Sequence, residues 1–85
     1  METRKKIFPS GKECIYTLLR FADFIIIKKN GCKWARIEPS KEDGPNWCKV
    51  FKYIPGRYGE VGKFMPFSSV PVRFEDVTLN RIYLG

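Results

Sequence analysis

The side chains that most often carry out catalysis are few in this sequence and far apart. The 85-residue chain contains no histidine, which removes the commonest general base near neutral pH. Cys14, Cys32 and Cys48 are widely spaced and form no Cys-x-x-Cys pair of the kind found in zinc sites. The acidic pairs at 42–43 and 75–76 have the surroundings of solvated turns. We therefore expect no enzyme activity, no metal site and no cofactor.

Positive charge is the strongest functional signal in the sequence. Sixteen lysines and arginines stand against nine acidic residues, so the formal net charge is +7. A field of this size on a small protein attracts polyanions and accelerates encounter with them. The alternative is that the charge serves solubility alone. We favour a polyanion partner, and RNA in particular.

Cations and aromatic residues alternate along residues 32–37 and 47–54, where neighbouring side chains of a strand would face opposite sides. One side carries small residues suited to a core: Ala35, Ile37, Cys48, Val50 and Ile54. The other side would then present Trp34, Arg36, Trp47, Lys49, Phe51 and Tyr53. Such a surface suits single-stranded RNA, because bases stack on rings and cations neutralise phosphates. The reverse register, with Lys33 and Lys52 outward, is the stronger alternative, because large aromatic side chains fill small cores well.

Further cations cluster near the N-terminus, around a hairpin and in a glycine-rich segment. Gly56, Gly59 and Gly62 recur beside Arg57, but their spacing matches neither a Walker loop nor a dinucleotide fingerprint, so a flexible connection is favoured over a phosphate cradle. The candidate RNA-binding residues are Lys5, Lys6, Lys28, Lys29, Lys33, Trp34, Arg36, Trp47, Lys49, Phe51, Tyr53 and Arg57.

Short strands separated by turn-forming residues are expected to position these side chains. The clearest local signal is Asn30-Gly31 between residues 24–29 and 32–37, since Asn-Gly supplies the positive φ angles of a tight hairpin. The pattern predicts one domain over residues 1–85, mainly β, as a small antiparallel sheet or barrel of five to six strands. The other expected strands are 4–8, 13–21, 47–54, 70–74 and 77–84, with a flexible basic segment at 1–6, a loop at 39–46 and a connection from 55 through 66.

Residues 11–22 are the ambiguous part of this assignment. Apolar residues from Ile15 onward recur at helical spacing, and Ser10 with Glu13 fits a capping box. Aromatic and β-branched residues become dense after Phe21, which favours a strand. A helix over 11–22, giving an α+β fold, is the alternative.

The sequence also bears on the compartment. No apolar run approaches the ~20 residues that a membrane-spanning helix needs. The basic N-terminal segment lacks the apolar region of a signal peptide, and an odd number of dispersed cysteines suits reduced thiols. We expect a cytoplasmic protein without a membrane partner.

Two basic stretches, Thr3-Arg-Lys-Lys6 and Lys28-Lys-Asn-Gly-Cys-Lys33, dominate the character of this compact chain. In this it resembles the small basic proteins that phages make to disarm host defences, among them the toxin inhibitory factors of T-even phages. The resemblance implies an RNA-binding antagonist of a host ribonuclease toxin of the ToxN type, acting through RNA-bridged binding in the host cytoplasm. The alternative is an inhibitor that docks on an acidic surface of a host enzyme by protein–protein contacts.

Overall fold

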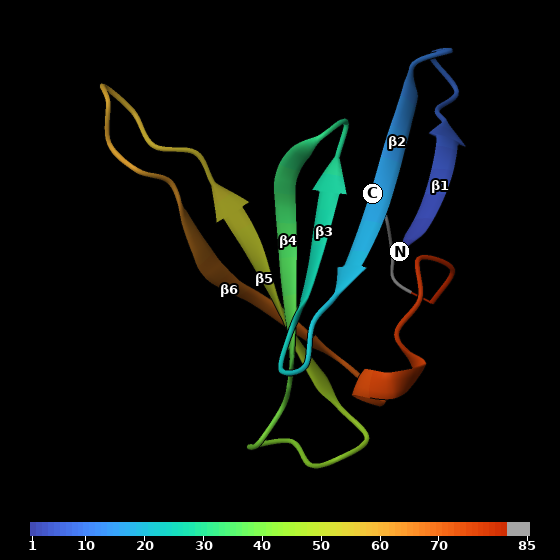
Figure 1. Ribbon diagram of the computed structural model, residues 1–85, viewed down its shortest axis with the longest axis vertical. Helices are drawn as coiled ribbons and strands as arrows, with labels where there is room; N and C mark the ends of the chain where they lie inside the picture. Colours follow the sequence, from blue (N-terminus) through green and yellow to red (C-terminus); the bar gives the residue numbers. More distant parts are fainter. Residues whose placement is uncertain (82–85) are drawn as a thin grey trace.

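The chain folds into one antiparallel sheet in which each strand pairs with the next along the sequence (Figure 1). The computed structural model describes residues 1–81. Its six strands are β1 (Glu2–Ile7), β2 (Glu13–Arg20), β3 (Ile25–Lys29), β4 (Cys32–Pro39), β5 (Cys48–Ile54) and β6 (Lys63–Val70), followed by a short 3-10 helix, η1 (Phe74–Asp76). The prediction of a mainly β fold is confirmed. The alternative helix over 11–22 is wrong, because β2 is held in the sheet by β1 and β3 on its two sides.

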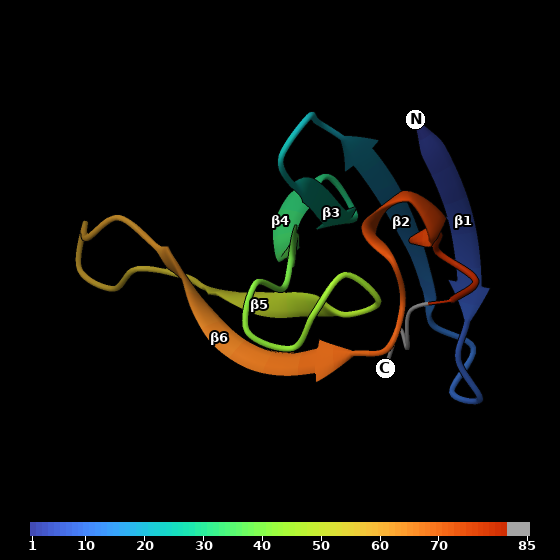
Figure 2. The ribbon, with the colours of Figure 1, turned by 90° about the horizontal axis from the view of Figure 1, so that it is seen from below.

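The sheet is open and curved, and it does not close into a barrel. The strand order runs from β1 to β6, and β1 and β6 are the two edges. The segment that follows β6 crosses to the concave side of the sheet and lies near β1 and β2 (Figure 2). We call the side of the sheet that receives this segment the inner face and the opposite side the outer face.

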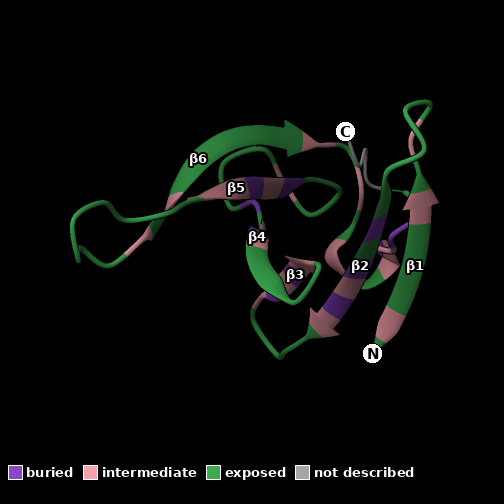
Figure 3. Cartoon of the chain, turned by 90° about the horizontal axis from the view of Figure 1, so that it is seen from above, coloured by how far each residue is buried: buried purple, intermediate pink, exposed green. Residues whose placement is uncertain are grey.

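The hydrophobic core lies between the inner face and the segment after β6. Alternate residues of the central strands are buried there, whereas β6 and most of β1 are exposed (Figure 3). Val77 and Leu79 of the final segment are fully buried, and each contributes about 1.5–3 kcal/mol of transfer free energy. The buried hydrophobic residues are Cys14, Tyr16, Leu18, Ile25, Ile27, Ala35, Ile37, Cys48, Val50, Val77 and Leu79.

Polar contacts from β1 and β2 fix the final segment on the inner face. The Arg20 guanidinium donates hydrogen bonds to the carbonyl oxygens of Phe74, at 3.0 Å, and Val77, at 2.7 Å. The Leu79 N–H donates to a carboxylate oxygen of Glu2 at 3.0 Å. These bonds satisfy backbone groups in the described part of the segment, residues 71–81, which forms no strand.

The predicted hairpin between β3 and β4 is confirmed. Asn30 and Gly31 have φ angles of 51° and 81°, as a tight turn of this kind requires. The Asn30 side chain also accepts a hydrogen bond from the Ile15 N–H at 2.9 Å, which ties the turn to β2. The hairpin is therefore held to the sheet by its turn residue as well as by its strands.

Predictions for the C-terminal third are largely wrong. Residues 63–66 were predicted to belong to a connection, but they form the first half of β6. Pro66 is tolerated there because β6 is an edge strand, which does not need the missing N–H of proline. The expected strand at 70–74 is absent, since Pro71 follows the last residue of β6 and η1 begins at Phe74. Of the expected strand at 77–84, residues 77–81 form no strand, and 82–84 lie outside the described residues.

Candidate nucleic-acid interface

Most of the predicted stacking surface lies on the outer face of β4 and β5. Arg36 pairs with Phe51 and Glu38 with Lys49, and residues paired across antiparallel strands share a face. Tyr53 follows at the next outward position of β5, and the Lys33 ammonium lies 5.8 Å from its ring centroid. Four of the residues that we grouped from the sequence are therefore on one face: Arg36, Lys49, Phe51 and Tyr53.

The residues predicted to face the core behave as expected with one exception. Ala35, Ile37, Cys48 and Val50 are buried, but Ile54 is 48% exposed. Ile54 is exposed because the pairing of β5 with β4 ends at Lys52, so the last residues of β5 extend past their neighbour.

Carboxylates neutralise the cations at the centre of the outer face. The Arg36 Nε lies 3.2 Å from an oxygen of Glu38, and the Lys49 Nζ lies 3.1 Å from an oxygen of Glu42. Exposed pairs of this kind add only about 0–1 kcal/mol to stability. Their effect on a ligand is larger, because each carboxylate repels an approaching phosphate. The outer face is therefore a weaker phosphate site than its composition predicts.

A β-bulge places Trp34 on the inner face, which corrects the prediction that it lies beside Arg36. The pairing of β3 with β4 shifts from Ile27–Ala35 to Lys28–Lys33, so Trp34 is the extra residue. Its ring packs edge-to-face on the ring of the fully buried Tyr16, with the centroids 5.3 Å apart. A prediction based on strict alternation fails at a bulge, because one inserted residue moves the side chains of all preceding residues in that strand to the opposite face of the sheet.

Lys52 lies on the same inner face as Trp34. It pairs with the buried Ala35, and its ammonium is 3.3 Å from the Trp34 ring centroid and 5.1 Å from that of Phe67. Cation–π contacts of this kind are attractive because the ring face is negative. Lys52 and Phe67 are not among the RNA-binding residues predicted from the sequence. The position of Lys52 among the inward residues of β5 was the available signal.

Lys29 completes this group. It pairs with the buried Tyr16 and therefore faces inward. Burial lowers the pKa of Lys52, and the positive charge of Lys29 lowers that pKa further. Within residues 1–81, neither ammonium has a carboxylate in ion-pair distance. We call Lys29, Trp34, Lys52 and Phe67 the inner-face cluster.

The other predicted cations divide between the two faces. Lys28 and Lys33 pair on the outer face, whereas Lys29 faces inward, so the hairpin tip does not present its three charges together. Lys5 also faces outward and forms an ion pair with Glu13 at 3.1 Å. Lys6 pairs with the buried Cys14, and its ammonium lies 5.0 Å from the Phe8 ring centroid. The basic residues from 2 to 6 thus belong to β1.

The last two predicted residues, Trp47 and Arg57, lie beyond opposite ends of β5. The carbonyl oxygen of Arg57 accepts a hydrogen bond from the Glu60 N–H at 3.0 Å, which closes a turn in the glycine-rich loop. A Cβ on Gly56 would lie 1.8 Å from the Glu60 carbonyl oxygen, so this glycine allows the close approach within the loop. A structural role thus accounts for Gly56 without a bound phosphate.

Residues 1–81 hold no group of three or more metal-ligating side chains of the types Cys, Asp or Glu. The described helical structure contains no segment long and apolar enough to cross a membrane. Compared with known proteins, the chain matches no protein family, no curated protein and no solved structure.

Proposed function

We propose that the protein binds RNA without catalysis and holds phosphates with the inner-face cluster. The observation that supports this most directly is that Lys52 lies over the rings of Trp34 and Phe67 and is repelled by the nearby charge of Lys29, while no carboxylate among the described residues forms an ion pair with either ammonium. Cations next to aromatic rings are the combination that single-stranded nucleic acid requires.

Electrostatics favour an anion at this position. Lys29 and Lys52 repel each other across a partly desolvated surface, as the lowered pKa of Lys52 indicates. A phosphate between them replaces that repulsion with two attractions. Each phosphate contact with a single strand also releases bound counterion and contributes about 0.7 to the salt dependence of the affinity.

Filter binding across a salt series tests the proposal. A labelled single-stranded RNA of mixed sequence is titrated with the protein between about 50 and 200 mM salt. We expect measurable affinity at the lowest salt that falls linearly on a logarithmic plot. Affinity that is undetectable at low salt, or independent of salt, would contradict the proposal.

The biological setting that we propose follows the resemblance to small basic phage proteins, such as the toxin inhibitory factor TifA of T-even phages. In that setting the protein acts in the host cytoplasm, and RNA bridges it to a ribonuclease toxin of the ToxN type. A pull-down from host extract, with and without nuclease, tests this. Association that nuclease abolishes supports an RNA bridge.

The second candidate function is inhibition of a host enzyme by direct docking on an acidic surface. The observation that favours it is the open edge of β6, where Met65 is 42% and Phe67 is 66% exposed. An unpaired edge with apolar side chains can add a strand of a partner. Association that survives nuclease in the same pull-down supports this alternative.

A further inference from the structure

Lys52 occupies the ring surface of Trp34 that a base would need. Its ammonium lies 3.3 Å from the ring centroid, which is contact distance, while the ring also packs edge-to-face with Tyr16. Phe67 lies within reach of the same ammonium, at 5.1 Å. A flat ligand can therefore stack on this face of the Trp34 ring only if the Lys52 side chain moves.

The Lys52 side chain is flexible, and its observed position is electrostatically unfavourable. Its charge sits on a flexible four-carbon stem, so rotation about side-chain bonds suffices. Burial and the neighbouring Lys29 already disfavour its ammonium in the observed position. An anion near Lys29 offers the ammonium a stronger partner than a neutral ring.

We propose that the inner-face cluster binds one nucleotide of a single strand, with the base stacked on Trp34 and the adjoining phosphate held by Lys52 and Lys29. This inference rests on the proposed function and adds to it the form of nucleic acid that binds. Phosphate attraction withdraws Lys52 from the ring, and the withdrawal exposes the ring to the base.

Duplex RNA does not satisfy this site. Its bases are stacked on one another and paired, so no base face is available to an aromatic ring. Trp34 and Lys52 are also partly buried on the concave side of the sheet, where a flexible strand can bend inward and a rigid helix cannot. We expect a preference for single strands of at least about tenfold, which is the effect of one base stack.

Fluorescence of Trp34 measures the stacking step directly. The chain contains two tryptophans, so Trp47→Phe leaves Trp34 as the sole emitter. In that background, an unstructured single-stranded RNA and a fully paired RNA hairpin of equal length are titrated at the same low salt. The single strand should quench the emission, and the hairpin should bind at least about tenfold more weakly.

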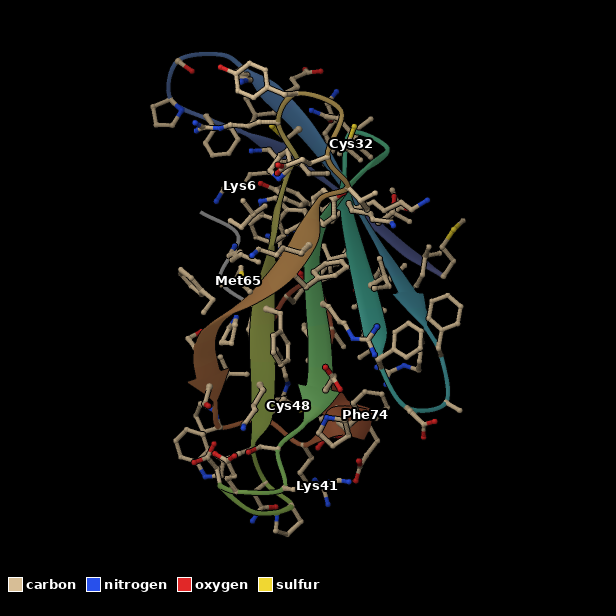
Figure 4. The ribbon with its side chains drawn as sticks, turned by 90° about the vertical axis from the view of Figure 1, so that its left-hand side faces the viewer. Lys6, Cys32, Lys41, Cys48, Met65 and Phe74 are labelled. Carbon is tan, nitrogen blue, oxygen red and sulfur yellow. The ribbon has the colours of Figure 1, made fainter. Side chains whose placement is uncertain are left out.

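Variants assign the effect to residues. Trp34→Leu, followed by filter binding, should lower single-strand affinity about tenfold and leave hairpin affinity unchanged. Phe67→Leu is a second variant, and it should leave folding intact because Phe67 is largely exposed. It should also weaken single-strand binding. Lys52→Met should also weaken single-strand binding, because Lys52 is proposed to hold the phosphate. Its matched control is Lys41→Met, which removes the same charge at the end of the sheet opposite Cys32, the strand partner of Lys29 (Figure 4).

The outcomes separate this inference from the function on which it rests. If both RNAs bind equally, with affinity that falls with salt and depends on Lys29 and Lys52, the single-strand inference is overturned and the RNA-binding proposal stands. If the single strand binds without quenching Trp34, the stacking arrangement is overturned. If neither RNA binds at low salt, both proposals are overturned.

Discussion

Replacing Tyr16 by phenylalanine should stabilise this protein. The Tyr16 side chain is fully buried in the core, and its hydroxyl has no hydrogen-bond partner among residues 1–81. Burial raises the pKa of this hydroxyl, and the nearby Cys14 raises it further. A hydroxyl that left its water partners on folding and found no replacement opposes folding.

The magnitude follows from that loss. An unsatisfied buried polar group costs about 1–3 kcal/mol, whereas Tyr16→Phe keeps the ring and its edge contact with Trp34. Removing one oxygen from a packed site leaves a small void, which offsets part of the gain. We expect a net stabilisation of about 1 kcal/mol, equivalent to a rise in Tm of about 4–8 °C for a domain of this size.

Urea denaturation followed by circular dichroism measures this difference, provided that the m-value is unchanged. Tyr58→Phe is the matched control, because Tyr58 is 102% exposed and its hydroxyl is solvated; its effect should stay within about 0.5 kcal/mol. If Tyr16→Phe lowers the free energy of unfolding, the Tyr16 hydroxyl has a partner in solution and the reasoning is wrong.

Three further predictions concern the turn, the thiols and alkaline pH. Gly31→Ala should lower the free energy of unfolding in urea by about 1 kcal/mol, because Gly31 has a φ of 81°; an unchanged midpoint would refute this. Ellman's reagent should modify the exposed Cys32 rapidly and reach the buried Cys14 and Cys48 only as the chain unfolds, so rapid reaction of all three contradicts the burial. Burial raises the pKa of Cys48 above its ordinary 9.0, with Glu75 acting in the same direction. The stability that the neutral Cys48 thiol contributes is therefore intact below pH 9.0 and is lost as pH rises through the folded-state pKa, and Cys48→Ala should make thermal stability less sensitive to alkali.

The sequence carried enough information for the first five strands. Asn30-Gly31 defined the hairpin because few residues adopt its backbone angles, and β-branched residues after Phe21 favoured a strand over the alternative helix. The start of β6 was mispredicted because the glycine-rich connection was predicted to run through Pro66. The tolerance of Pro66 depends on β6 being an edge strand, which is a property of the assembled sheet.

The candidate site was only partly predictable, for a reason of geometry. Lys29 and Trp34 were named from the sequence, but the bulge in β4 moved Trp34 to the face opposite Arg36. Composition also did not reveal which cations have carboxylate partners. The pairing of Lys49 with Glu42 joins β5 to a loop, and it exists only once the chain has folded.

The central claim is that phosphates are held on the inner face and not on the outer face. The most direct measurement compares the salt dependence of single-stranded RNA binding for two double variants, Lys29→Met with Lys52→Met and Lys33→Met with Lys49→Met. Both remove two positive charges, so general attraction falls equally. We predict that the inner-face pair reduces the slope of log affinity against log salt by about 1.4 and that the outer-face pair leaves it unchanged. A reduced slope for the outer-face pair, with the inner-face pair behaving as wild type, would contradict the account.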